Sequence, residues 1–517
     1  MRVAKTARKI KRIQVEKSKK EQKVTGLAGL IMYMEQMRAM GLWQETEKYV
    51  QVSRADQGWT DMEMVIFLVL LNLAEGTSTS DIEKLEQDDG LRKVLKNRGF
   101  WGLNQKQIRE LEKRWRILKK RAVASEGSVR RYLKKFHSEE EEERRKAKGA
   151  PKAFIPRMTA GFSGLNKLIA FTTNYVQRAL KPDTATLNMD ATIVRSEKDT
   201  AMMTYKGFRG YQPFNVQWDE TEMMVYTEFR DGNVPAGYEQ KRMLEASLDN
   251  LPEGIKTVRV RSDSAGYQHD LMRYMEKGEN ERFGRIEFAI SCDVTEAFRR
   301  AVNEVPEDQW HDLNKLYPDG DAIQTGRQWA EVVYVPNEIA HSKDDPEYRY
   351  IAIRTPVQTE LFDQQQPQQG TLNFDTHRVR MSTGSYRVFG VVTNMDWDGE
   401  TLINWHRQRA GKGEEIQAVM KTDMAGGIVP VHEFGGNAAW WMIAALASNI
   451  NQIMKILALP VSWRSHRMKA IRFKFINLAA NILQRGHDLA IKFSSQKLVD
   501  IFLQARERMR LLPVPLC

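Results

Sequence analysis

The hydrophobic pattern divides the chain into a helical first part and a strand-rich middle. Between residues 26 and 95 the apolar side chains recur at helical spacing, most densely in residues 62–73. A second helical region, rich in Lys and Arg, covers residues 105–148. After the linker-like residues 149–152, runs that favour β-strands take over. The pattern therefore predicts a helical N-terminal region followed by a mixed α/β part.

The elements predicted between residues 184 and 290 occur in an informative order. Strands are expected over residues 184–194, 203–214 and 222–230, a helix over 240–248, a strand over 255–263, a helix over 270–275 and a strand over 285–290. This is the element order of the ribonuclease-H-like fold. Residues 329–394 are β-rich again apart from the polar tract at 363–370, and we interpret them as a β insertion in that core.

Composition indicates a large globular protein of two to four domains. The chain has 517 residues, 42% of them hydrophobic and 28% charged, which is too long for one core. The longest apolar stretch, residues 438–459, contains Asn451 and Lys455 and fits a buried helix rather than a membrane span. No secretory signal is evident, and Cys292 and Cys517 lack partners at ligand spacing. We expect a cytoplasmic protein without disulfides or structural zinc.

The charge balance favours a polyanionic partner, and nucleic acid is the first candidate. Lys and Arg number 79 against 67 Asp and Glu, which gives a net charge of +12. Residues 1–24 hold ten Lys or Arg and two Glu, so we expect a solvated basic arm.

A helix-turn-helix-like segment is predicted over residues 122–136, where Ser128 is expected to cap the second helix. Such a helix would present basic side chains to a DNA groove, namely Arg130, Arg131, Lys134 and Lys135. An ordinary solvated helix face is the alternative interpretation.

Two predicted strands each deliver one aspartate to a stretch of few other charges. Asp190 lies within the run 184–194, and Asp263 ends the run 255–263. An unpaired carboxylate in a central strand is costly to bury, so a metal ion is a suitable partner. A turn or a helix N-cap would also explain Asp263, which Ser264 follows.

A third carboxylate, Glu414, opens a helical stretch that ends at Lys421. Residues seven apart on an α-helix share one face, so both side chains would point the same way. Gly411 and Gly413 argue against a helix upstream, which places Arg409 in the turn that enters it. Glu415 competes with Glu414 as a metal ligand, and a solvent-exposed ion pair is the bland alternative. Three carboxylates suit hard divalent cations, which favour oxygen ligands.

At these residues the chain resembles the DDE transposases of bacterial insertion sequences, in the branch whose ribonuclease-H-like core carries a β insertion. The likeness rests on residues 187–192, on residues 261–266 and on the stretch from Trp405 to Lys421. That branch has a Tyr-x2-Arg-x3-Glu-x6-Lys signature. Here Glu414 and Lys421 keep its last gap, whereas Arg409 lies five residues before Glu414, and Trp405 or His406 stands where tyrosine is usual.

The resemblance implies an enzyme that binds double-stranded DNA at terminal inverted repeats, cuts it and joins it to target DNA, as a homodimer on paired ends. Asp190, Asp263 and Glu414 would hold two Mg²⁺ ions, with Mn²⁺ as a substitute. Arg409 and Lys421 would contact phosphates, and Trp397 would stack on a base, unless it is simply packed in the core. The expected location is the bacterial cytoplasm, on the nucleoid.

The implied domain order is a basic arm (1–24), a helical DNA-binding region (25–150), a first core part (151–300), a β-rich insertion (301–400), a second core part (401–460) and a helical C-terminal region (461–517). Two other functions remain open. A ribonuclease-H-like nuclease without strand transfer would use the same carboxylates. A non-catalytic DNA-binding derivative of a transposase would keep only the basic regions.

Overall fold

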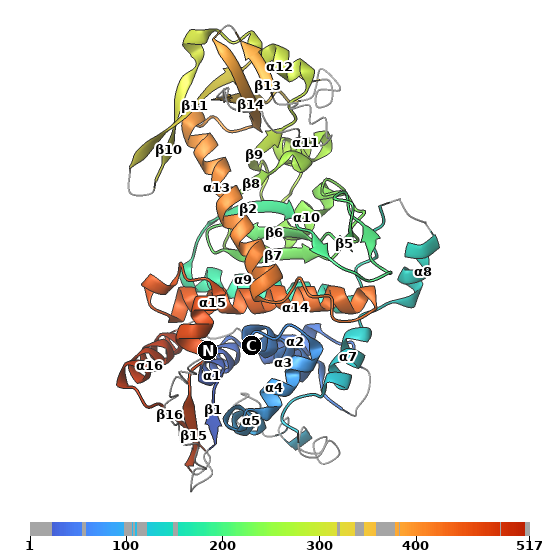
Figure 1. The fold of residues 1–517 in the computed structure, drawn as a ribbon, viewed down its shortest axis with the longest axis vertical. Helices are drawn as coiled ribbons and strands as arrows, with labels where there is room; N and C mark the ends of the chain where they lie inside the picture. The colour runs from blue at the N-terminus through green and yellow to red at the C-terminus, as the bar shows by residue number, and fades with distance from the viewer. Residues whose placement is uncertain are drawn as a thin grey trace, which may run out of the picture.

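The computed structural model describes residues 23–53, 58–97, 106, 109–110, 121–147, 153–317, 321–336, 346–357, 378–381, 383–485 and 488–511. Figure 1 shows a strand-rich upper part and a helical lower part, with the long helix α13 (Gly399–Ala418) running down from one toward the other. The expected basic arm, the linker at 149–152 and the polar tract at 363–370 lie outside these residues, except for positions 23 and 24.

One large mixed sheet organises the upper part. Its strands run in the order β10-β11-β12-β14-β9-β8-β2-β6-β7, and β13 pairs with β14 beside this path. Within it, β2 is antiparallel to β6 and β6 to β7, whereas β2 is parallel to β8 and β8 to β9. The central strands are β2 (Thr184–Ala191), β6 (Phe214–Trp218), β7 (Met223–Glu228), β8 (Thr257–Ser262) and β9 (Glu287–Cys292).

The second strand of this sheet differs from the one expected from the sequence. Residues 203–214 do not form one strand, because Gly207 adopts a left-handed φ of 80° in a tight turn between residues 204 and 208. They contribute instead to a small antiparallel sheet of β3 (Val194–Arg195), β5 (Arg209–Tyr211) and β4 (Met202–Met203). The large sheet takes β6 in their place.

The strands expected as an insertion extend the same sheet. They are β10 (His311–Leu316), β11 (Ala322–Val332), β12 (Arg349–Pro356), β13 (Arg378–Met381) and β14 (Gly384–Thr393). Residues 390–393 of β14 pair with residues 289–292 of β9, which joins the two halves edge to edge. The chain then leaves β14 and enters α13.

Helices cover the sheet and form the lower part. The helices α10 (Gln240–Asn250) and α11 (His269–Lys277) pack into a core with the central strands, and α12 (Glu296–Asn303) joins that core. On β7 lie α9 (Ala160–Leu180) and α14 (Phe434–Ile453), which also contact each other. The helix α14 is buried nearly throughout, as expected of residues 438–459. Among the residues described, no helix has the length and apolar character to cross a membrane.

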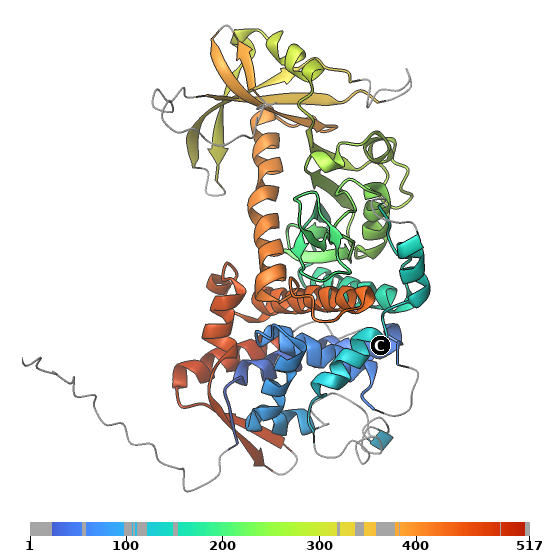
Figure 2. The same cartoon turned by 45° about the vertical axis from the view of Figure 1, so that its right-hand side comes forward.

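The lower part joins segments from both ends of the chain in one core, visible in Figure 2 where blue and red elements lie together. Its N-terminal helices are α1 (Ala28–Met40), α2 (Leu42–Tyr49), α3 (Asp61–Leu73), α4 (Ile82–Gln87) and α5 (Asp89–Lys96), and its C-terminal helix is α16 (Gln496–Arg510). The C-terminal region is not wholly helical, because β15 (Ala480–Arg485) pairs antiparallel with β16 (Asp488–Lys492) and with β1 (Val24–Thr25).

The remaining elements are short. They are η1 (Thr79–Asp81), α7 (Glu126–Lys134), α8 (Glu139–Ala147), η3 (Ser264–Gly266), η4 (Glu307–Gln309), η7 (Val461–Trp463), α15 (Met468–Ile471) and the π-helical turns η5 (Val419–Asp423), η6 (Met454–Ala458) and η8 (Arg472–Ile476).

Candidate active site

The two predicted strand aspartates lie at the same edge of the large sheet. The parallel strands β2 and β8 are in register from Thr184 opposite Thr257 to Met189 opposite Ser262. Asp190 is the next residue of β2 and Asp263 is the first residue after β8, and both are half-buried. Asp263 also caps η3, where its Oδ1 accepts a hydrogen bond of 3.1 Å from the Ala265 N–H. The N-cap role and a place in a carboxylate pair therefore coexist.

The electrostatics of Asp190 reflect this pairing. Burial and the nearby Asp263 carboxylate together raise the pKa of Asp190 to about 6, although Arg409 and a hydrogen bond from Gln417 act in the opposite direction. A like-charged neighbour in a half-buried site disfavours ionisation, and a bound cation would relieve that repulsion.

A buried polar network holds the two strands against α13. Arg261, whose side chain is fully buried, donates from Nε to Asn188 Oδ1 at 2.8 Å and from Nη1 to the Trp405 carbonyl at 2.6 Å. Its Nη2 lies 2.7 Å from Asp219 Oδ1, which also accepts a hydrogen bond of 2.9 Å from Asn188. Asn188 and Arg261 each precede one of the two candidate aspartates by two residues. Alternation along a strand therefore places them on the same face as those aspartates.

The helix α13 differs from the expected one, because it is continuous from Gly399 to Ala418 and passes through Gly411 and Gly413. Arg409 thus lies inside the helix and not in an entering turn, and Glu414 lies in its last turns rather than at its start. The helix is held on both sides of the glycines. Leu402 and Ile403 are buried upstream, as are Ile416 and Met420 downstream, and this packing outweighs the low helix propensity of glycine.

The two candidate glutamates of α13, Glu414 and Glu415, do not join Asp190 and Asp263 in a cluster that could hold a metal ion in the described part of the chain. Glu414 is exposed. Glu415 is also exposed, and its carboxylate lies 3.9 Å from Arg467 Nε. The α13 side chain that reaches Asp190 is Gln417, whose Nε2 donates to Asp190 Oδ2 at 2.8 Å. Sequence reasoning missed Gln417, which lies one helical turn after Glu414.

Two more polar residues of α13 face the sheet edge. His406 Nε2 lies 3.2 Å from the Ser262 carbonyl, and burial together with neighbouring arginines lowers the pKa of His406 to about 3. Arg409 acts electrostatically on Asp190, and its buried Nε has no hydrogen-bond partner among the residues described. Lys421 is half-buried in η5, where the switch to π-helical geometry breaks the expected seven-residue alignment with Glu414.

Two of the three predicted ligands form a donor set that fits a divalent cation. Asp190 and Asp263 are hard oxygen donors whose mutual repulsion a cation would relieve, so these two residues fit Mg²⁺. Across the described ranges, no cluster of three or more His, Cys, Asp or Glu side chains is arranged to hold a metal ion. The structure thus brings together two of the three predicted ligands and leaves Glu414 apart.

The ring of Trp397 is engaged within the protein. It is half-buried and packs edge-on against Trp405 with ring centroids 5.4 Å apart, while the Arg259 guanidinium lies 4.9 Å from its centroid. A base could stack on the ring face that Arg259 covers only if Arg259 moved.

The helix predicted in residues 122–136 exists as α7, with a different cap. The Ser125 side chain accepts from the Ser128 N–H, so Ser125 and not Ser128 is the N-cap. Arg130, Arg131 and Lys134 are all exposed, while their neighbours are buried. Each basic side chain has a local partner, namely Glu126 for Arg130 at 2.9 Å, Ser128 for Arg131 at 3.2 Å and Glu433 for Lys134 at 3.3 Å.

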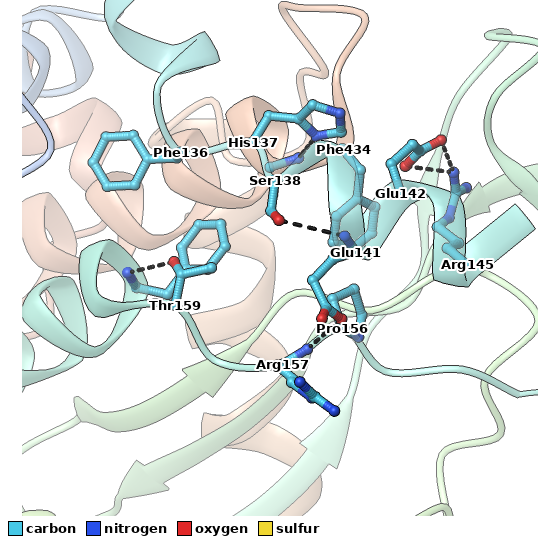
Figure 3. A pocket seen from close by; sticks show the side chains of 12 residues that line it. Phe136, His137, Ser138, Glu141, Glu142, Arg145, Pro156, Arg157, Thr159 and Phe434 are labelled. Carbon is cyan, nitrogen blue, oxygen red and sulfur yellow. Dashed lines mark hydrogen bonds and ion pairs between the residues drawn. The ribbon is translucent and has the colours of Figure 1, made fainter.

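A small cavity lies where the segment after α7 meets the start of α14 (Figure 3). Its volume of about 20 Å³ suffices for one water molecule. The polar groups drawn there satisfy one another. Arg145 pairs with Glu142 at 2.9 Å, and the Glu141 carboxylate accepts from the Arg157 N–H at 3.0 Å. We interpret this cavity as a packing junction.

Comparisons with known proteins identify the family to which the chain belongs. A family model described as "Transposase DDE domain group 1" matches residues 7–514. A solved structure titled "Cryo-EM structure of piggyBac transposase synaptic complex with hairpin DNA (SNHP)" is similar at 10% sequence identity and a TM-score of 0.37, over 93% of this chain and 81% of that chain. No curated protein matches the chain.

Proposed function

The chain belongs to the group 1 transposases with a DDE domain, and from this premise we propose that it binds the terminal inverted repeats of a bacterial insertion sequence and catalyses DNA cleavage and strand transfer. The observation that carries the proposal is the pair of half-buried carboxylates, Asp190 and Asp263, at one edge of the sheet. The net charge of +12 supports a DNA partner.

The proposed core is ribonuclease-H-like. Its five strands would be β7-β6-β2-β8-β9, in which β2 is flanked by an antiparallel strand on one side and a parallel strand on the other. In this proposal β10 to β14 are the insertion, and α13 returns the chain to the site. Residues 25–150 would supply DNA binding, with Arg130, Arg131 and Lys134 of α7 toward the DNA.

Asp190, Asp263 and Glu414 are the proposed ligands of two Mg²⁺ ions, for which Mn²⁺ would substitute. Such ions activate a water or a 3′-hydroxyl and stabilise the leaving 3′-oxygen. Asp190 first has to be deprotonated, which its pKa of about 6 permits at neutral pH. Glu414 has to turn toward the aspartates, and Gln417 has to release Asp190 Oδ2.

The cations around the site would position the DNA. Arg409 has a buried Nε without a partner among the described residues, and it lies close enough to Asp190 to act on its charge. We assign it to a phosphate beside the scissile bond, with Lys421 at a neighbouring phosphate. Coupling two element ends requires at least two protomers, so we propose a homodimer on paired ends. Trp397 would stack on a base through the ring face that Arg259 covers only after Arg259 has moved.

The test is Mg²⁺-dependent cleavage and joining on DNA that carries the element's own ends. The intact protein should cut at the ends and join the 3′ ends to target DNA, whereas Asp190→Asn and Asp263→Asn should bind the ends without cutting. Cleavage without joining would identify a nuclease instead. Binding without cleavage by the intact protein would identify a non-catalytic DNA-binding derivative.

A further inference from the structure

A second, larger cavity lies at the foot of α13. Its volume is about 250 Å³, and α14 with its continuation η6, the end of α13 and residues 464–468 line it. In Figure 1 the lower end of α13 lies beside α14 and α15. Four polar residues spaced along one side of α14 and η6 face this cavity, namely Ser448, Asn451, Gln452 and Lys455.

Lys455 is the unusual member of this lining. Its side chain is only 7% exposed, and its ammonium makes no hydrogen bond or ion pair with any residue that the structure describes. Burial lowers the pKa of Lys455 and outweighs the opposite influence of Glu222 and Glu415. A buried cation without a close partner is costly, and an anion that enters the cavity would offset this cost.

The other charges of the cavity leave room for an anion. Glu222 accepts a hydrogen bond of 3.1 Å from Gln452, and the exposed Glu415 lies near Arg467. Arg464 and Arg467 are exposed at the mouth. Arg467 also lies 3.8 Å from Asp423 Oδ2, and Arg464 donates to the Ile456 carbonyl at 3.1 Å. Of the three cations in the lining, Lys455 is therefore the one without a hydrogen bond or ion pair among the residues described, and the two arginines would have to exchange contacts they already make.

The cavity lies directly beside the proposed active site. The last turn of α13 presents Gln417 to Asp190 and presents Glu415 and Ile416 to the cavity, and Val419 at the start of η5 also lines the cavity. One helix thus separates the carboxylate pair from the Lys455 ammonium.

We propose that this cavity binds a phosphate group of the DNA backbone, with Lys455 at its floor and Arg464 and Arg467 at its mouth. The inference rests on the proposed function for its choice of DNA as the source of the phosphate. Free phosphate or a nucleotide has the same chemistry, and the experiment separates these sources. The amide of Asn451 adds a donor, because its Oδ1 already accepts a hydrogen bond of 2.7 Å from the Tyr33 hydroxyl.

The experiment measures binding of a short fluorescent DNA duplex over a range of salt concentrations, in EDTA so that no cleavage occurs. Replacing Lys455 by Met keeps the length of the side chain and removes the charge. For Lys455→Met we expect weaker binding and a slope of log K against log salt that is smaller by about 0.9, the value for one phosphate contact. The control is Lys277→Met at the exposed end of α11, which removes one charge far from the cavity lining and should leave the slope unchanged.

Thermal unfolding distinguishes this role from a structural one. Because Lys455 is buried without a close partner, Lys455→Met should melt at the temperature of the intact protein or above it. A lower melting temperature together with an unchanged slope would show that Lys455 serves packing, and would overturn the proposal. Arg464→Gln, at the exposed mouth, gives a second reading that does not depend on folding of the buried variant.

Inorganic phosphate tests whether the cavity takes a phosphate of DNA or a free anion. Phosphate should raise the melting temperature of the intact protein and not that of Lys455→Met, while the DNA slope falls in the variant. If phosphate stabilises only the intact protein and the DNA slope does not change, the cavity takes a free anion and the assignment to DNA is wrong. A reduced slope in a protein that never cuts DNA would uphold the cavity and refute the proposed strand transfer.

Discussion

The ends of the strands β2 and β8 bring their two carboxylates together, whereas the helix α13 does not bring its candidate glutamates to the same place. Asp190 and Asp263 lie together because β2 and β8 are parallel and in register, so the residues that follow the paired positions arrive at one edge. On α13 each residue turns the side chain by about 100°. Glu414 and Glu415 therefore point to different surroundings from Gln417, which alone reaches Asp190 among the three. A strand fixes direction by alternation, whereas a helix fixes it only when its phase is known.

Loss of either strand aspartate should abolish almost all cleavage. Asp190→Asn or Asp263→Asn should reduce cleavage at least about a thousandfold, because loss of a metal ligand costs more than loss of the residues that orient it. DNA binding in EDTA should persist. The matched control is Asp183→Asn, an exposed aspartate just before β2, which should keep its activity. Full activity in either active-site variant would remove the carboxylate pair from the mechanism.

Substitutions on α13 can show which of its two adjacent glutamates, Glu414 or Glu415, takes part in cleavage. Glu414→Gln should reduce Mg²⁺-dependent cleavage at least about a hundredfold, whereas Glu415→Gln should change it only a few-fold, since Glu415 lies near Arg467 beside the large cavity. Single-turnover cleavage of labelled ends measures both. The reverse order of effects would show that the phase of α13 in the active complex differs by one residue. Unchanged rates in both variants would leave Gln417 as the α13 residue nearest to the chemistry.

The positions of Asp190 and Asp263 at the ends of their strands could be predicted from the sequence. The direction in which each α13 side chain points could not, and the reason is physical. Alternation and strand length are local properties, so Asp190 and Asp263 could be placed without knowledge of the rest of the fold. The continuity of α13 through Gly411 and Gly413 depends on packing of residues distant in the chain, which glycine propensity does not reveal. The pairing of β1 with β15 across most of the chain length is equally invisible to local patterns.

Arg261 links the strands β2 and β8 to the helix α13. Arg261→Met removes the cation that joins Asp219, Asn188 and the Trp405 carbonyl. The nearly buried Asp219 carboxylate then loses its ion pair with Arg261. The free energy of unfolding should fall by about 3 kcal/mol, measured by urea denaturation. Adding Asp219→Asn to this variant should recover part of the loss, because the buried negative charge that Arg261 balances is then removed as well. If the single variant is as stable as the intact protein, the network does not hold α13 to the sheet.

The dependence of stability on pH tests the repulsion between the Asp190 and Asp263 carboxylates. The pKa of Asp190 in the folded protein, about 6, lies above the value of about 3.9 for an unfolded aspartate, so the folded state binds the proton more tightly. Its contribution to stability is complete below about pH 4 and is lost as the pH rises through about 6. In EDTA, the intact protein should therefore lose roughly 2 kcal/mol relative to Asp190→Asn between about pH 4.5 and about pH 7.5. Urea unfolding at both pH values measures this difference. Mg²⁺ should restore the loss at the higher pH in the intact protein alone, because the cation takes the place of the proton. Parallel stabilities of the two proteins would mean that the paired strands do not force the carboxylates together.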